Sequence, residues 1–318
     1  MLRKVLLVLF SLGLAACAPQ AAPAPAPVAG VTAASPTLTL TATPSATASA
    51  TRTATATVSA TPTSSPTATA SPTGTPAPQP TPDAAAADRQ ARLPILMYHY
   101  VEPWPADASD LRRGLTVRPE DFAAQMQFLA DQGYTAVSLY ALADALALGT
   151  PLPERAVVLT FDDGYRSLME HALPVLQAHG FTGTVFVITE LMDRGLPAYL
   201  TWDQARALAA LGWRIEPHTK THETLAGRSR DKQLYEILGA VETIEANLGA
   251  RPRFLCYPSG KYDATSIQLA REIGLWGAVT TQPGRLHTYT ARYTWTRLRV
   301  DGRGTLRDFV NAVSGGRP

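Results

Sequence analysis

The segment Ala156-Val-Val-Leu-Thr-Phe-Asp-Asp-Gly-Tyr165 says most about how this chain folds. Its first six residues, Ala156–Phe161, form a short apolar run with β-branched and aromatic side chains, which predicts a buried strand. Two adjacent aspartates, Asp162 and Asp163, follow directly. Aspartates after a strand are often only a loop cap, so their meaning depends on what the other strand ends carry.

Seven more short apolar runs follow the same pattern and alternate with helical stretches. Phe122, Met126 and Leu129 have i, i+4, i+7 spacing, and Pro119 occupies a first-turn position. Repeated strand–helix alternation predicts an α/β fold with a parallel sheet, either a closed barrel or an open doubly wound sheet. The other predicted strands are Pro94–Tyr98, Tyr134–Ser138, Thr184–Ile188, Trp213–Glu216, Phe254–Tyr257, Gly277–Thr280 and Thr296–Val300.

Reactive side chains follow several of these runs at the point where each strand ends. His99 follows the first strand, His218 follows the run around Ile215, and Ser259 follows Leu255-Cys-Tyr-Pro258. In a barrel the carboxyl ends of all strands face one rim, which is where barrel enzymes carry their chemistry. We therefore expect these segments to converge there.

His218 and His222 are four residues apart, so on one helical turn both imidazoles would face the same way. With a carboxylate from Asp162 or Asp163 they would form a His₂-carboxylate set that leaves a coordination position open. A pair of histidines alone is weak evidence, since surface chance also produces it. Zinc is the default ion for such a set, and nickel, cobalt or iron would satisfy the same ligands.

Two neighbouring aspartates can divide the work at such a site. One would hold the ion, and the other would take a proton from an activated water. The turn at Ser259 could supply a backbone donor to an oxyanion, and His99 could give a proton to a leaving amine. This combination predicts hydrolysis of an amide or an ester.

These residues resemble the polysaccharide deacetylases, the NodB-homology family of metal-dependent carbohydrate esterases, from about Leu93 to Val300. The resemblance implies that Asp162 is the catalytic base, that Ser259 gives the oxyanion N–H, and that a divalent ion is bound. The implied metal ligands are Asp163, His218 and His222. The motifs that carry the resemblance are Thr160-Phe-Asp-Asp-Gly-Tyr165, His218-Thr-Lys-Thr-His222 and Tyr257-Pro-Ser-Gly260.

Leu96-Met-Tyr-His99 is similar to the start of the biofilm poly-N-acetylglucosamine deacetylases, a branch with permuted motif order. This similarity implies that His99 is the catalytic acid and that the fold is an irregular (β/α)₇ barrel. Leu200-Thr-Trp-Asp-Gln204 and Arg297-Leu-Arg-Val300 also look like this branch. Aromatic residues beside the motifs are candidates for sugar contact: Tyr100, Trp104, Tyr165 and Tyr257.

Three residues depart from the family pattern. Cys256 stands where the larger family often has an arginine that holds the catalytic aspartate, and what replaces that arginine is left open. Glu216 could support a metal-binding histidine or be a solvated side chain, and the solvated alternative is favoured. His287 is expected to be a loop residue.

The N-terminal region carries targeting signals. Arg3 and Lys4 precede the apolar run Val5–Leu14, and Leu14-Ala-Ala-Cys17 follows, which predicts a signal peptide at residues 1–16. Cys17 resembles a lipobox cysteine, so we expect it to be lipidated, although an ordinary signal peptide would also fit. Cys17 and Cys256 are the two cysteines of the chain, which excludes a disulfide framework.

Composition separates the rest of the chain into a linker and a domain. Arg52 is the only charged residue between Ala18 and Pro82, and such an Ala/Pro/Thr/Ser tract is typical of a disordered linker. We assign residues 17–91 to this linker and residues 92–318 to the catalytic domain. A net charge of +2 without a basic run argues against nucleic-acid binding.

Together with these residues, the resemblance implies a metal-dependent hydrolase that removes N-acetyl groups from an N-acetylglucosamine-containing cell-wall or extracellular polysaccharide. Its predicted place is outside the cytoplasm, attached to a membrane through the lipid on Cys17. An O-acetyl polysaccharide esterase would use the same residues. A catalytically silent carbohydrate-binding lipoprotein is disfavoured, because a silent protein would be expected to have lost one of the reactive residues.

Overall fold

The computed structural model describes residues 79–315 of the 318-residue chain. The predicted signal peptide at residues 1–16, the lipidation candidate Cys17 and the predicted linker up to residue 78 lie outside the described residues. None of the helices between residues 79 and 315 has the length and apolar character that a bilayer crossing requires.

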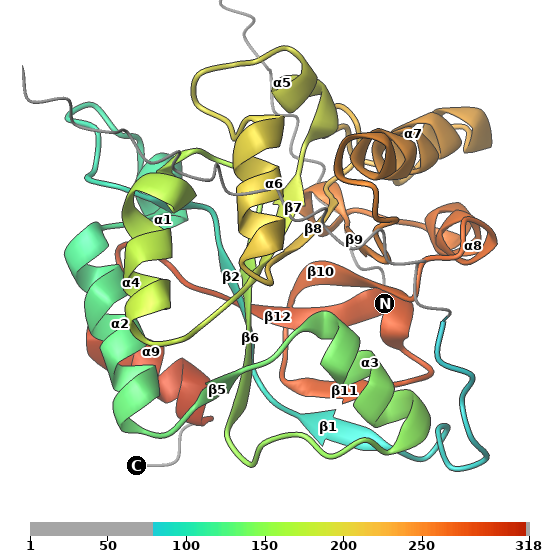
Figure 1. Ribbon diagram of the computed structural model, residues 1–318, viewed down its shortest axis with the longest axis horizontal. Coiled ribbons are helices and arrows are strands. Elements are labelled where there is room, and N and C mark those ends of the chain that lie inside the picture. The colour runs from blue at the N-terminus through green and yellow to red at the C-terminus, as the bar shows by residue number, and fades with distance from the viewer. Residues whose placement is uncertain (1–78, 316–318) are drawn as a thin grey trace, which may run out of the picture. The chain divides into compact units, whose positions relative to one another are not determined.

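Parallel strands form the centre of the fold, hydrogen-bonded in the order β8-β7-β6-β2-β12-β10-β9, with β5 paired to β6. The sheet curves into a nearly closed barrel surrounded by helices (Figure 1). This confirms the irregular (β/α)₇ barrel and excludes the open doubly wound sheet. The strands are β2 (Ile95–Tyr98), β5 (Thr135–Ala136), β6 (Ala156–Phe161), β7 (Thr184–Val187), β8 (Arg214–Pro217), β9 (Phe254–Cys256), β10 (Gly277–Pro283) and β12 (Trp295–Arg299).

Each of the eight predicted strands is present; β6 has the predicted ends, and the other seven have changed ends. β5 is shorter than predicted because it pairs only with the start of β6, at Thr135 and Ala136. β10 runs to Pro283, past the predicted end at Thr280, and its pairing with β12 shifts register between Val279 and Pro283. Such an irregularity carries no hydrophobic alternation, so the sequence pattern could not reveal it.

Two short strand pairs were not predicted. β1 (Gln90–Arg92) pairs antiparallel with β11 (Leu286–Thr288), and β3 (Tyr100–Val101) pairs with β4 (Thr116–Val117). β1 falls in a stretch that the sequence assigns mainly to the linker, so ordered structure begins before the predicted boundary. Strands of two or three residues are too short for a period-2 pattern to be recognised.

His287 lies in a strand, and the prediction of a loop residue is wrong. It is fully buried in β11, and its Nε2 is 3.1 Å from the backbone oxygen of Leu93. Burial lowers the pKa of His287 to about 4, so a neutral imidazole donates to that oxygen at neutral pH. The burial comes from pairing with β1, a contact between segments far apart in sequence. His287 is therefore a structural residue.

The helices cover the outside of the barrel and begin where their sequences favour it. α2 starts at Pro119, as predicted, with Glu120 and Asp121 in its first turn. α6 starts with a capping box between Thr201 and Gln204. The helices are α1 (Asp110–Leu115), α2 (Pro119–Asp131), α3 (Leu139–Leu148), α4 (Leu173–Ala178), α5 (Thr189–Asp193), α6 (Trp202–Ala210), α7 (Arg230–Leu248), α8 (Ala264–Glu272) and α9 (Leu306–Ser314).

Alternate residues of each strand join different apolar clusters. Along β6, Val157 and Leu159 belong to the cluster that includes Phe122 and Met126 of α2, whereas Val158 belongs to a second cluster. Ile95, Phe186, Phe254 and Trp295 share that second cluster, which brings β2, β7, β9 and β12 together inside the barrel. The barrel interior is thus mainly apolar below the level of the reactive side chains.

Candidate active site

The reactive side chains continue the inward-facing rows of the strands. Ile95 and Val158 belong to the cluster inside the barrel, and side chains two or four positions further along an extended chain point the same way. His99 therefore follows the inward row of β2, and Asp162 follows that of β6. The alternation that builds the core thus also aims these two side chains at one place.

The strand ends open into a cavity of about 360 Å³. The residues given a catalytic or metal-binding role in the sequence analysis all line it: His99, Asp162, Asp163, His218, His222 and Ser259. The predicted convergence of four distant segments is therefore observed.

Three of these residues form a set that fits a divalent cation. The Oδ1 atom of Asp163 lies 3.4 Å from Nε2 of His218 and 3.4 Å from Nε2 of His222. That oxygen is buried and has no hydrogen-bond partner within residues 79–315. A buried acceptor without a partner is costly, and a cation would satisfy it together with both imidazoles. The fit is to a three-ligand site with room for water or substrate.

A backbone carbonyl orients the first histidine. Nδ1 of His218 lies 2.8 Å from the backbone oxygen of Cys256. Nδ1 therefore carries the proton and donates, which leaves the lone pair of Nε2 facing Asp163. Hydrogen bonding of the second ring nitrogen to a carbonyl is the usual support for a metal-binding histidine.

The two histidines do not share a helical turn, and this part of the prediction is wrong. His218 follows β8 and the chain to His222 is a loop, in which Thr219 and His222 have φ values of 64° and 65°. The left-handed residues bend the chain so that the two rings still meet, with centroids 4.8 Å apart. Spacing alone could not distinguish this bend from a helix.

Backbone strain concentrates at this site. Four non-glycine residues of the described chain have positive φ, namely Asp163, Thr219, His222 and Ser259. A left-handed conformation is uncommon for such residues and costs free energy. Three of them line the cavity, and Thr219 lies between the two histidines. The strained backbone therefore coincides with the residues whose side chains or N–H groups face the cavity.

Asp162 is held as a carboxylate by a buried arginine. Nη1 and Nη2 of Arg297 donate to Oδ1 and Oδ2 of Asp162, each at 2.7 Å. Burial would raise the pKa of Asp162, but the charge and hydrogen bonds of Arg297 outweigh it, and the pKa lies well below its ordinary value. Asp162 is therefore ionised and fixed in orientation at neutral pH.

His99 lies beside Asp162 at the cavity wall. Its Nε2 is 4.0 Å from Oδ2 of Asp162, and its side chain is 12% exposed. Burial lowers the pKa of His99, while the nearby Asp162 and Asp163 charges oppose that shift. A mostly buried imidazole that faces the cavity has the position that a proton donor to a bound substrate requires.

Ser259 occupies a tight turn after β9. Gly260 N–H donates to the oxygen of Tyr257, and Lys261 N–H donates to that of Pro258, so neither turn bond uses the N–H of Ser259. With φ at 53°, Ser259 holds its backbone in an unusual direction at the cavity. This is the position that the sequence assigned to an oxyanion donor.

Comparison with known proteins identifies the family. The sequence profile of the family described as "Polysaccharide deacetylase" matches residues 149–278. The putative polysaccharide deacetylase YxkH of Bacillus subtilis is 30% identical over 213 residues, covering 67% of this chain and 73% of that protein. The chain belongs to the polysaccharide deacetylase family.

Other relatives agree with this assignment. The poly-β-1,6-N-acetyl-D-glucosamine N-deacetylase of Escherichia coli is 34% identical over 261 residues, covering 69% of this chain but 38% of that protein. The Streptococcus pyogenes deacetylase PplD, solved with acetate, has a TM-score of 0.66 at 27% identity, covering 72% of this chain and 100% of that one. IcaB from Ammonifex degensii, at 22% identity, has a TM-score of 0.62, covers 72% of this chain and 98% of that one, and shares the fold.

Arg297 of β12 fills the place that the sequence of this polysaccharide deacetylase left open at Cys256. It is fully buried and reaches Asp162 from a different strand, with Nη2 3.1 Å from the Cys256 sulfur. Arg297 was visible in the sequence only as part of a family-like segment. An arginine inside a predicted strand, two positions after the apolar Trp295 and so on the same face, would have been the signal to look for a carboxylate partner.

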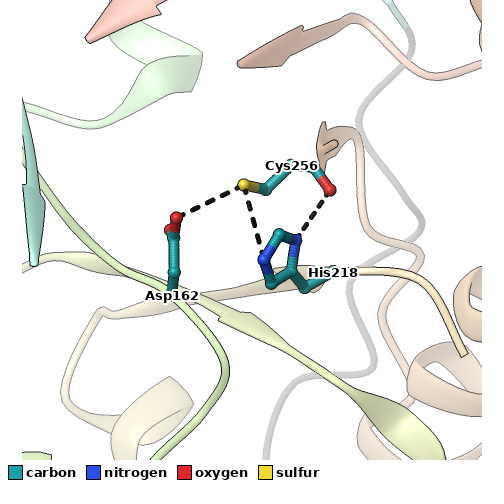
Figure 2. A group of neighbouring side chains, drawn as sticks. All are labelled: Asp162, His218 and Cys256. Atoms are coloured by element: carbon teal, nitrogen blue, oxygen red, sulfur yellow. Dashed lines mark hydrogen bonds between the residues drawn. The ribbon is translucent and has the colours of Figure 1, made fainter. Parts of the chain in front are cut away.

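Cys256 forms a second group with Asp162 and His218 that has metal-like spacing (Figure 2). Its sulfur is 3.5 Å from Oδ2 of Asp162 and 3.9 Å from Nε2 of His218. Burial raises the pKa of this thiol, and the Arg297 guanidinium already occupies the space beside it. Since Nε2 of His218 can serve one ion, the set with Asp163, whose Oδ1 lacks a partner within residues 79–315, is the better candidate to hold a metal.

The predicted sugar-contact residues are divided between the cavity and its surroundings. Tyr165 and Tyr257 line the cavity. Tyr100 stacks on Tyr165 with ring centroids 3.6 Å apart, so it supports the wall from behind. Trp104 does not line the cavity. Its indole N–H donates to the backbone oxygen of Thr116, which holds the ring beside β4.

Proposed function

We propose that this protein is a metal-dependent deacetylase that hydrolyses N-acetyl groups of an N-acetylglucosamine-containing polysaccharide outside the cytoplasm. The observation that carries the proposal is the buried, unpartnered Oδ1 of Asp163, which faces two imidazole nitrogens beside an ionised Asp162. The similarity to an E. coli enzyme named for poly-β-1,6-N-acetyl-D-glucosamine supports the substrate class.

The geometry of the cavity supports the following proposed roles. Asp163, His218 and His222 would hold a divalent ion, with zinc as the default. Such an ion supplies Lewis acidity, which polarises an amide carbonyl and makes a water molecule more acidic.

The other residues of the chain act on the water and the substrate. Asp162 takes the proton of the attacking water, because its orientation and charge are fixed by Arg297. The Ser259 N–H donates to the oxyanion that develops on the carbonyl. His99 acts in its protonated form, which the nearby Asp162 and Asp163 charges favour, and this imidazolium gives its proton to the amine as the C–N bond breaks. Tyr165 and Tyr257 form the wall against which a sugar ring would lie.

Acetate release from defined substrates tests this proposal. The full chain is incubated with β-1,6- and β-1,4-linked N-acetylglucosamine oligomers and with O-acetylated xylan, each with and without a chelator. We expect chelator-sensitive acetate release from one of the two N-acetylated oligomers. Release from xylan alone would establish the O-acetyl esterase instead, and bound oligomer without any acetate release would indicate the carbohydrate-binding alternative.

The N-terminal signals extend the proposal to the location of the enzyme. We propose that the signal peptide ends at residue 16, that Cys17 carries lipid, and that the Ala/Pro/Thr/Ser tract lets the domain reach a polymer. Incorporation of labelled fatty acid into the wild-type chain, lost in Cys17→Ser, is the expected result. Equal incorporation in both chains would contradict it.

A further inference from the structure

The barrel has one seam without strand-to-strand hydrogen bonds. β8 and β9 are the two ends of the strand order, and no ladder of the described chain joins them. They are nevertheless neighbours, because the His218 imidazole that follows β8 contacts the last carbonyl of β9, at Cys256. β9 is paired on its other side with β10, so the distance between that carbonyl and β8 must be set by something other than a ladder across the seam.

A buried carboxylate bridges this seam. Oε2 of Glu216, on β8, accepts hydrogen bonds from the backbone N–H groups of Arg253 at 2.8 Å and Phe254 at 2.7 Å, at the start of β9. Oε1 accepts the phenolic O–H of Tyr140, on α3, at 2.7 Å. With 1% of its surface exposed, Glu216 is not the solvated side chain that the sequence favoured. It takes the place of the missing ladder.

On each of the two strands, the residue that takes part in the Glu216 bridge lies two positions before the residue that takes part in the His218 contact. Glu216 and His218 are two residues apart, and so are Phe254 and Cys256. Alternation places both side chains of the first pair on the same face of β8. The seam is thus fixed at one level by Glu216 and at the next by the bond from His218 to the Cys256 oxygen. Without the Glu216 contact, β9 keeps its pairing with β10 but loses its anchor to β8, so the distance from the Cys256 oxygen to Nδ1 is no longer fixed from the seam side.

We propose that Glu216 is a positioning residue for His218: by closing the seam between β8 and β9 it fixes the carbonyl that keeps the proton on Nδ1. The lone pair of Nε2 then faces Asp163. The consequence for catalysis rests on the proposed metal site, whereas the effect on the imidazole does not.

The glutamate side chain is well suited to bridge β8 and β9. A carboxylate offers acceptors on both oxygens, and its charge strengthens the three hydrogen bonds that it accepts. Glutamine keeps the length and one carbonyl oxygen for the two N–H groups, and its NH₂ can donate to the oxygen of Tyr140. Alanine removes the bridge altogether. Glu216→Gln is therefore the conservative variant, and Glu216→Ala is the disruptive one.

The test measures the tautomer of His218 by ¹⁵N NMR of the imidazole nitrogens in chelator-stripped protein, assigned with His218→Gln. Because burial raises the pKa of Glu216 to about 7, spectra are recorded near pH 8.5, where the carboxylate is ionised. Zinc affinity, measured by competition with a chelating dye, is the second readout. The matched control is Phe309→Ala, a core truncation on α9 remote from the seam that also lowers stability.

We expect the wild type, Glu216→Gln and Phe309→Ala to show a single Nδ1–H tautomer. Glu216→Ala should show a mixture and bind zinc about 10–100-fold more weakly, the usual effect of losing an outer partner of a metal ligand. A wild-type tautomer and wild-type zinc affinity in Glu216→Ala would overturn the inference.

Two further outcomes are informative. If the wild type binds no zinc but its Nδ1–H tautomer is lost in Glu216→Ala, the positioning role stands and the proposed metal site fails. If Glu216→Ala does not fold, Glu216→Asp replaces it, because a side chain one methylene shorter retracts from the Arg253 and Phe254 N–H groups. Retention of the wild-type tautomer and affinity in Glu216→Asp would then overturn the inference.

Discussion

Asp162→Asn should lower kcat for acetate release by about 10²–10⁴-fold, the range expected for loss of a general base. The amide has nearly the same volume as the carboxylate, but it cannot take a proton from water. Asp163, His218 and His222 are unchanged, so metal binding should persist. Initial rates on the accepted oligomer, together with bound metal per chain, measure both effects.

The control for this variant is Asp301→Asn, which also removes a carboxylate paired with an arginine. Asp301 pairs with Arg303 and does not line the cavity, so kcat should stay close to that of the wild type. If Asp162→Asn retained more than about a tenth of the wild-type rate with metal bound, the base would be another group.

Arg297→Met should destabilise the chelator-stripped protein by about 3–5 kcal/mol at neutral pH, because it leaves the buried Asp162 charge without a partner. Methionine fills much of the space of the arginine, so the loss reflects charge more than volume. The activity of the metal-loaded variant should also fall, since Asp162 loses both hydrogen bonds that fix its orientation. Urea unfolding and acetate release measure the two effects.

The size of this destabilisation should depend on pH. In the wild type the depressed pKa of Asp162 makes the ion pair fully stabilising above the ordinary carboxyl pKa of about 3.9. That contribution is lost as pH falls through the lowered pKa. In Arg297→Met burial instead raises the pKa, so acidification neutralises the unpaired charge. The stability difference between the two proteins should therefore shrink at acid pH.

Arg303→Met is the matched control for Arg297→Met. The guanidinium of Arg303 also donates two hydrogen bonds to a single carboxylate, that of Asp301, but both side chains are about half exposed. Water replaces such a partner at little cost, so this variant should lose much less stability. Equal losses in the two variants would contradict the role of burial, and no loss in Arg297→Met would contradict the ion pair itself.

The eight central strands could be predicted from the sequence because each contains a local apolar run, whereas closure of the sheet into a barrel was implied by the family resemblance. Runs such as Ala156–Phe161 are continuous and apolar, and helices such as α2 begin with a first-turn proline. The reactive residues follow these runs directly. A closed barrel then requires His99, Asp162 and His218 to meet at one rim, and the structure brings all three into one cavity.

Contacts between distant segments could not be predicted. Arg297 reaches Asp162 across 135 residues of sequence, and Glu216 reaches Phe254 across 38 residues. Both side chains are charged, which favours an exposed position when a sequence is read alone. Their burial becomes reasonable only when the partner is known. The bend between His218 and His222 was missed for a related reason, since left-handed Thr219 has no local signature.

Metal titration of chelator-stripped protein tests the central claim most directly. Zinc is added in steps to the wild type and to Asp163→Ala, and bound metal and acetate release from the accepted oligomer are followed together. The account predicts that wild-type activity rises with bound zinc and saturates at one equivalent, while Asp163→Ala stays inactive at the same zinc concentrations. Full activity of the stripped wild-type protein, or equal restoration of both proteins by zinc, would contradict it.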